Sequence, residues 1–388
     1  MRVSVVQNID GIPARDWDRL AGDDNPFLRH AFLRALEQCG CVGPGTGWQP
    51  NHLTLWDAQR LVGAIPGYLK EHSFGEFVFD WAWAEAYARA GVPYYPKWIS
   101  AVPFTPVTGR RLLVAEDSDP ASLREYLIEA QLGFLRRQDL SSAHWLFTPA
   151  EDTQALEGFD LAVRLGCQYH WHNPGYRDFQ DYLDQLKSKR RKEIRRERRQ
   201  ANAAGLEVTV LSGHEIEDAQ WRTYHQFYCS TFDRKWGYPS LTLDFFRQLG
   251  RDMPDSVVLA LAQRKGCPVA GALALRGPDA LFGRHWGCAE QVPGLHFELC
   301  YYRLIDYCIR HGLRRFEAGA QGEHKITRGF EPVRTWSAHW IGHPGFRRGI
   351  HAFVQQERSE MGRYFQALAS HSAYRDGASP LYEGRVLS

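Results

Sequence analysis

The chain has 388 residues, too many for one typical hydrophobic core, so we expect two domains of about 150–200 residues each. Hydrophobic residues make up 44% of the chain, an ordinary share for a globular protein. The net charge is only +2, which excludes a protein that coats nucleic acid over its whole surface.

The cysteines and the N-terminus bear on the cellular compartment. Eight cysteines are scattered along the chain without a CxxC pair or a zinc spacing, and a chain of this size needs no disulfide staples. The first ten residues lack the apolar core of a signal peptide, and no apolar run approaches the roughly 18 residues of a membrane span. We therefore expect a cytoplasmic protein with reduced thiols and no transmembrane segment.

The first half of the chain is predicted to mix helices with short strands. Helices are predicted over 13–21, 27–38, 77–90 and 120–137. Strands are predicted over 3–9, 52–56, 61–69, 98–102, 112–114 and 144–147.

The second half opens with a long polar helix predicted over 178–204. Further helices are predicted over 214–232, 242–251, 295–311 and 349–369. Strands are predicted over 206–211, 257–263, 269–275, 281–288, 315–318 and 335–341.

Both halves follow the same order of helices, strand pair, strand, helix and strand. The paired strands also look alike locally, since 61–66 parallels 269–274. This order predicts a structural duplication and an α/β (α+β) fold in which helices flank mixed sheets. We expect one domain over 1–172 and a second over 173–388, the second including the basic helix 178–204 and the closing helix 349–369.

The richest polar segment, 316–330, follows a predicted strand. It places three glycines among site-capable side chains, of which Gln321, Lys325 and Arg328 suit a polar or anionic substrate. Ligand sites in α/β folds commonly lie beyond strand ends. Glu323 or His324 could take a proton from an attacking amine. The alternative is a solvated loop whose glycines serve only to adopt positive φ.

Other candidates lie just before this segment. Glu298 falls in the first turn of the helix 295–311, where a carboxylate complements the helix dipole or orients an amine. Arg284 and His285 alternate on a strand, so only one of them can address the site as a ligand for a carboxylate or phosphate.

Aromatic and histidine residues complete the candidate list. Trp81 and Trp83 belong to an aromatic group that suits either an acceptor groove or a core. The pairs His170/His172 and His339/His343 lack a third ligand nearby in the sequence, so we expect no metal.

The segment 187–199 carries most of the positive charge. It holds nine Lys or Arg and two Glu, a local charge of +7 that leaves about −5 for the rest of the chain. Leu183, Leu186 and Ile194 would share one apolar face of this helix. A phosphate-rich partner such as tRNA, a nucleotide or phospholipid headgroup, and a charged spacer helix all remain open.

The running order of the elements resembles the GNAT acyltransferase fold, and particular residues resemble its FemAB-like branch, which is labelled peptidoglycan biosynthesis or recognition. In the first half the resemblance is carried by 50–55, 79–84 and 97–109. In the second half it is carried by 283–288, 295–302 and 317–328. The resemblance implies two tandem GNAT-like domains, each a mixed sheet flanked by helices, with the long basic helix near their junction.

The resemblance also implies a donor. GNAT enzymes use acyl-coenzyme A, and backbone amides at a helix N-terminus hold its pyrophosphate. Gln291 and Gly294 match two anchors of that turn, whereas His296 stands where the family has a small residue and Pro293 removes an amide. Fem-type relatives use aminoacyl-tRNA instead, so both donors stay open.

The resemblance implies a transferase, an N-acyltransferase that moves an acyl or aminoacyl group to an amine of a bulky polar acceptor by direct attack. Glu323, His324 and Glu298 are the expected catalytic residues. Two alternatives remain: a Fem-like peptidoglycan-precursor ligase that binds aminoacyl-tRNA through 187–199, and an inactive protein that recognises a ligand or peptide. The oligomeric state is left open by the sequence.

Overall fold

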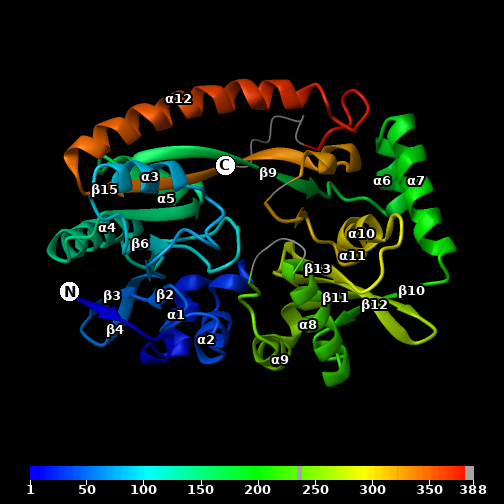
Figure 1. The fold of residues 1–388 in the computed structure, drawn as a ribbon, viewed down its shortest axis with the longest axis horizontal. Coiled ribbons are helices and arrows are strands. Elements are labelled where there is room, and N and C mark those ends of the chain that lie inside the picture. The colour runs from blue at the N-terminus through cyan, green and yellow to red at the C-terminus, as the bar shows by residue number, and fades with distance from the viewer. Residues whose placement is uncertain (234–237, 321, 381–388) are drawn as a thin grey trace. The chain divides into compact units, whose positions relative to one another are not determined.

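The computed structural model describes residues 1–233, 238–320 and 322–380 (Figure 1). These residues form two compact units. Unit 1 comprises residues 1–167 and 334–364, and unit 2 comprises residues 168–333 and the described residues from 365 to 380. The chain therefore passes between the units more than once.

Unit 1 contains two sheets. One is antiparallel with the order β1-β3-β4-β7, and in the other β15, β8, β6, β5 and β2 are successive neighbours. The strands are β1 (Arg2–Val6), β2 (Trp48–Pro50), β3 (His52–Asp57), β4 (Arg60–Ile65), β5 (Tyr68–Lys70), β6 (Lys97–Ser100), β7 (Leu113–Val114), β8 (Ser142–Thr148) and β15 (Glu331–Ile341). β6 and β8 are parallel, and helix α4 (Pro120–Arg137) joins them in the chain.

Unit 2 is built on one sheet, in which β10, β11, β12, β13, β14 and β9 are successive neighbours. The strands are β9 (Ala162–His172), β10 (Glu207–Ser212), β11 (Val257–Arg264), β12 (Cys267–Arg276), β13 (Ala280–Cys288) and β14 (Arg315–Glu317). β13 and β14 are parallel and are joined through a helical segment, and the neighbours on either side of them are antiparallel.

The two units share a topology. In each, a strand pairs with an antiparallel hairpin, β1 with β3–β4 and β10 with β11–β12, and a helical connection later joins two parallel strands. The last strands are exchanged between the halves of the sequence. β9 follows β8 in the chain but pairs with β14, and β15 follows β14 but pairs with β8.

The helices surround these sheets. Unit 1 has α1 (Ala14–Ala21), α2 (His30–Gln38), α3 (Trp81–Arg89), α4 and α5 (Ala150–Glu157), with short 3-10 turns η1 (Ile9–Gly11) and η2 (Pro26–Leu28). Unit 2 has α6 (Phe179–Gln185), α7 (Ser188–Ala203), α8 (Asp218–Asp233), α9 (Leu243–Asp252), η3 (Pro254–Ser256), α10 (Leu295–Phe297), the π-helical η4 (Glu298–Tyr302), α11 (Arg303–Arg310) and η5 (Glu323–Arg328). The last helix is α12 (Pro344–Ala369).

The exchange of strands changes the domain boundaries that we expected. Residues 344–364 of the closing helix belong to unit 1, although we placed this helix in the second domain. The physical reason is packing, since Ile350 and Val354 of α12 share a buried core with Trp83 and Tyr87 of α3. A single cut at 172 therefore does not describe the division of the chain.

The predicted basic helix 178–204 is two helices, because the chain is extended at Leu186 and Lys187. Leu186 forms a β-bridge with Tyr374, and the Lys187 N–H donates to the Ala373 carbonyl. This pairing with a segment far along the chain interrupts the helix.

Membrane insertion was also assessed on the structure. Over the ranges that the structure describes, none of the helices combines the length and the apolar character that crossing a bilayer requires.

Candidate functional site

The candidate site of unit 2 begins where β14 ends, between two neighbouring strands that both continue past it. Glu317 of β14 is paired with Phe282 of β13 on one side and with His170 of β9 on the other. After β14 the chain turns through Gly319 and Gly322, whose φ values of +82° and +117° suit glycine. It then enters η5, which holds most of the predicted polar segment in a helical turn.

Lys325 is a buried cation of this region. Its side chain comes from η5 and the residue is only 2% exposed. Nζ donates to the Gly319 carbonyl at 2.8 Å, which uses one of its three N–H groups. Burial lowers the pKa of Lys325 to about 8, with Cys300 opposing and Arg284 reinforcing the shift. Such a lysine can change its protonation state near neutral pH.

Further charges lie around Lys325 near the end of β14. Burial lowers the pKa of Arg284 to about 10 against the effect of Glu317. Glu317 is bonded to Arg315 at 2.9 Å, and its other oxygen lies 3.8 Å from Nε2 of His170. Burial and the surrounding cations hold the pKa of His170 well below its usual value, so this imidazole is neutral. We call these five residues the Lys325 cluster, and its excess of cations over carboxylates suits a negatively charged group.

Arg328 is bonded within the protein. Its guanidinium donates to both carboxylate oxygens of Glu197 on α7, at 2.6 and 3.3 Å, and lies 3.6 Å above the ring of Phe297. Tyr302 donates to the same carboxylate. Arg328, which we predicted to bind the substrate, thus joins η5 to the basic helix α7. Such a bidentate ion pair is a strong, directional contact.

Glu298 has a similar position. It is completely buried at the start of η4, and its carboxylate accepts from Arg198 of α7 at 3.1 and 3.2 Å and pairs with Arg303 at 2.8 Å. Two guanidinium groups thus hold the carboxylate that we considered for orienting the amine, a geometry typical of an anchor for α7.

His324 and Glu323 are exposed on η5. Nε2 of His324 lies 2.9 Å from the hydroxyl of Tyr301, and burial together with Arg328 and Lys325 lowers the pKa of this histidine. A neutral imidazole at the surface of the cluster is suited to accept a proton. Gln321, the remaining candidate of this segment, lies outside the described residues.

The turn predicted to hold a coenzyme A pyrophosphate packs against α7. Gly294 has a φ of +80°, and a Cβ at this position would lie 2.8 Å from the backbone carbonyl oxygen of Glu197. Gln291 is exposed at the start of the turn. The α-helix that follows the turn has only three residues before the backbone becomes π-helical. The contact at Gly294 shows how closely the basic helix approaches this turn.

The other predicted residues make contacts of their own. His285 packs its ring against Tyr228, and burial lowers its pKa to about 3. Trp83 belongs to the core of unit 1, where its ring meets His339 edge-on. Trp81 is 44% exposed and contacts Phe74, also in unit 1. The structure thus gives Trp83 a packing role and leaves Trp81 at the surface.

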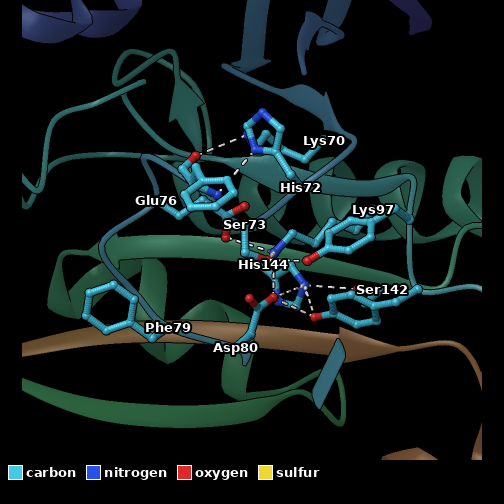
Figure 2. A network of polar contacts seen from close by, with 12 residues as sticks. Lys70, His72, Ser73, Glu76, Phe79, Asp80, Lys97, Ser142 and His144 are labelled. Atoms are coloured by element: carbon cyan, nitrogen blue, oxygen red, sulfur yellow. Dashed lines mark hydrogen bonds and ion pairs between the residues drawn. The ribbon is translucent and has the colours of Figure 1, made fainter. Parts of the chain in front are cut away.

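Unit 1 contains a buried polar network that we did not predict (Figure 2). At its centre the ammonium of Lys97, which is fully buried, donates to Ser73, Glu76 and Asp80. We call this group the Lys97 network. The signal for it was a lysine at the start of the apolar strand β6, where a charge needs buried partners.

The side chains that commonly bind metals are dispersed. In the part of the chain that the structure describes, the His, Cys, Asp and Glu side chains form no group of three or more that could hold a metal ion.

Comparison with known proteins places this architecture. The C-terminal domain of a putative lysylphosphatidylglycerol synthetase from Agrobacterium fabrum superposes with a TM-score of 0.53 at 10% identity, covering 89% of this chain and 96% of that domain. FemX superposes with a TM-score of 0.54 at 10% identity, covering 90% and 100% of the two chains. L-PGS from Bacillus licheniformis gives 0.50 at 11% identity, covering 86% and 98%. The expected α/β fold of tandem GNAT-like units is confirmed.

The sequence gives the narrower assignment. The model of the FemAB-like family, described as peptidoglycan biosynthesis/recognition, matches residues 8–376. The chain belongs to this family, as the resemblance of its motifs implied. No curated protein matches the sequence.

Proposed function

We propose that the protein is a transferase that moves an acyl or aminoacyl group to an amine of a bulky polar acceptor, with the Lys325 cluster as the site of transfer. The observation that carries the proposal is the position of Lys325. It is a buried ammonium with a pKa lowered to about 8, on a helical turn beyond the end of β14, with Arg284 nearby. Family membership and the shared fold support a transferase of the GNAT or Fem type.

The reaction needs a positive group where the carbonyl oxygen gains charge. The acceptor amine attacks the carbonyl carbon of the donor, so a C–N bond forms as the C–O bond of an ester, or the C–S bond of a thioester, breaks. Lys325 would stabilise the oxyanion and give a proton to the leaving group. His324, neutral and exposed, would take the proton that the amine loses. Glu298 and Arg328 would hold α7 in place.

The packing of Gly294 bears on the donor. A pyrophosphate that approached the backbone of this turn would meet the carbonyl of Glu197, which already lies against it. This contact favours a donor other than coenzyme A. Position 294 requires glycine because the Glu197 carbonyl of α7 leaves no room for a side chain. This requirement accounts for the glycine that matches the GNAT signature.

The surface of α7 favours aminoacyl-tRNA as the donor. Lys189, Lys192, Arg196 and Arg199 are all exposed, and their spacings of three, four and three residues place them along one face of the helix. This α7 basic stripe is about 15 Å long at 1.5 Å per residue. Its length and charge suit successive phosphates of a nucleic-acid backbone.

Transfer assays with defined donors test the proposal. The purified protein is mixed with a pool of tRNA charged with radiolabelled amino acids, or with acetyl-coenzyme A, together with lysine-containing cell-wall precursor peptides. We expect label to pass from charged tRNA to the peptide and RNase to abolish the transfer. Transfer from acetyl-coenzyme A alone would keep the transferase but overturn the tRNA donor. Binding of peptide without transfer from any donor would indicate a recognition protein.

A charge variant tests the stripe separately. Replacing its four residues by Gln should weaken tRNA binding at least tenfold and reduce its dependence on salt. The control replaces four exposed arginines of unit 1, Arg15, Arg89, Arg348 and Arg363, by Gln, which changes the net charge equally. Equal weakening by both variants would show that only the net charge matters.

A further inference from the structure

The Lys97 network of unit 1 is built around a lysine that shares its protons among three acceptors. Nζ donates to Oγ of Ser73 at 2.8 Å, to Oε2 of Glu76 at 2.8 Å and to Oδ2 of Asp80 at 2.5 Å. Figure 2 shows the lysine between these groups. All three hydrogen atoms of the ammonium are therefore used, and Lys97 bridges the two carboxylates through one oxygen of each.

Among the residues that the structure describes, none is a hydrogen-bond partner of the second oxygen of either carboxylate. These atoms are Oε1 of Glu76 and Oδ1 of Asp80, both shielded from solvent, and each residue is only 3% exposed. Asp80 holds the N-cap position of α3, yet its side chain makes no capping hydrogen bond. Its Oδ2 instead accepts from Tyr94 at 2.6 Å as well as from Lys97. Buried carboxylate oxygens without a donor are costly, so the pair of acids points to a missing donor.

The charges around the network show what kind of donor is missing. Two carboxylates face one fully bonded ammonium. Lys70 directs its Nζ to His72 and to the Phe74 carbonyl, 3.0 and 3.2 Å away, and burial lowers its pKa to about 7.

Histidine does not supply the missing charge. Burial lowers the pKa of His144 to about 3, and it keeps the pKa of His339 far below its usual value. The two rings meet with their Nδ1 atoms 2.7 Å apart, a contact in which one nitrogen donates and the other accepts. With both acids ionised, the charges that face them are the ammonium of Lys97, whose protons are all bonded, and Lys70, whose pKa of about 7 leaves it only partly protonated near neutral pH.

The segment that carries the two acids also presents aromatic rings to solvent. Phe74, Phe77, Phe79 and Trp81 are 65%, 38%, 52% and 44% exposed. The ring of Phe79 takes no part in the hydrogen bonds drawn in Figure 2. Aromatic faces attract cations and cover alkyl chains, so they suit an amine with an apolar stem.

We propose that the Lys97 network is a binding site for a primary ammonium group, which would donate to Oε1 of Glu76 and Oδ1 of Asp80 as Lys97 donates to their other oxygens. The amine's alkyl stem would leave past the exposed rings of residues 74–81. Lys97 is itself a primary ammonium between these acids, and it shows that the pair accepts this group. The proposal rests on the contacts of unit 1 and does not depend on the transfer reaction.

Calorimetric titration of the full chain with Nα-acetyl-lysine methylamide tests the site. We expect saturable binding by the wild type, and binding at least tenfold weaker for Glu76→Gln and for Asp80→Asn. Glu85→Gln, on the exposed side of α3, is the matched control and should bind as the wild type does. The Nε-acetylated form of the probe, which has no ammonium, should not bind.

A surface variant keeps the test decisive if a network variant does not fold. Trp81→Ala removes an exposed ring and should weaken binding several-fold without unfolding the protein. Absence of saturable binding to the wild type, equal binding of the acetylated probe, or unchanged affinity in both acid variants would overturn the proposal. Lys325→Met should bind the probe normally, so a failed transfer reaction and a failed amine site give different results.

Discussion

Lys97 in unit 1 and Lys325 in unit 2 are both buried in the same kind of fold, but the surroundings of these two lysines are opposite. Lys97 in unit 1 lies between two carboxylates and a hydroxyl, and all three of its N–H groups are bonded. Lys325 in unit 2 donates, within the described part of the chain, to one carbonyl at 2.8 Å and has an arginine nearby. Two units of the same topology thus carry different charge clusters. The Lys97 network of unit 1 is rich in carboxylates, and the Lys325 cluster of unit 2 is rich in cations.

This difference separates two kinds of recognition. Carboxylate oxygens without a donor attract a cation such as a protonated amine. Surplus cations attract an oxyanion or a phosphate. A transferase that joins an amine to a carbonyl needs both. The predictions below change one side of this comparison at a time.

The largest difference is expected in stability. Lys97→Met should lower the free energy of unfolding by about 3–5 kcal/mol, because it leaves two buried carboxylates without their cation. Lys325→Met should cost no more than about 1–2 kcal/mol, because it removes one hydrogen bond and also relieves the burial of a charge. Urea unfolding of both variants measures the contrast. Equal losses would show that the two lysines have equivalent surroundings.

A smaller difference is expected in the pH dependence of stability. Burial raises the pKa of Glu76 from 4.5 to about 7, against the opposing charge of Lys97, with Asp80 raising it further and Lys70 lowering it. Between these values the folded state keeps a proton that the unfolded state has released, so stability falls as pH rises. The wild type should lose on the order of 2–3 kcal/mol relative to Glu76→Gln between pH 4.5 and 7.5.

Urea midpoints of the two proteins, measured across this pH range, give the difference directly. Lys70 is present in both proteins, but the carboxylate of Glu76 raises its pKa, so Lys70 contributes to the difference together with Glu76. A difference that stays constant or grows in favour of the wild type with rising pH would mean that Glu76 is ionised throughout.

The smallest effect concerns the turn beneath α7. Gly294→Ala should be less stable than Gly312→Ala by about 1–2 kcal/mol, because overpacking adds to the strain of positive φ. Both glycines have positive φ, +80° and +66°, but a Cβ meets the Glu197 carbonyl only at position 294 and meets nothing within 4 Å at position 312. Thermal unfolding measures the pair. Equal losses would mean that α7 does not close this turn.

Local patterns in the sequence predict much of the fold. The sequence correctly places the alternating strands, the hairpin of residues 257–275 and the polar segment beyond β14. The conformation of each of these elements is determined mainly by residues close to it in the chain. The exchange of β9 and β15 was missed because strands of similar composition do not encode their distant partners. The interruption at Leu186 was missed for the same reason, since its partner is Tyr374.

The site was harder to predict than the fold. Sequence shows that Arg328 and Glu298 can bind charged ligands, but not that Glu197, Arg198 and Arg303 already occupy them. The partners of Lys97 come from a segment some twenty residues earlier and were hidden among aromatic residues. Lys325 was assigned to substrate binding, and its burial gives the reason for proposing it at the reacting carbonyl.

A single-turnover measurement of transfer by Lys325→Met tests the central claim most directly. Labelled aminoacyl-tRNA, the acceptor peptide and excess enzyme are mixed, and the peptide product is followed over time beside the wild type. We expect the variant to bind both substrates but to transfer at least about 100-fold more slowly, because the oxyanion loses its stabilising cation. Transfer at the wild-type rate by this variant would contradict the assignment of the reaction to the Lys325 cluster.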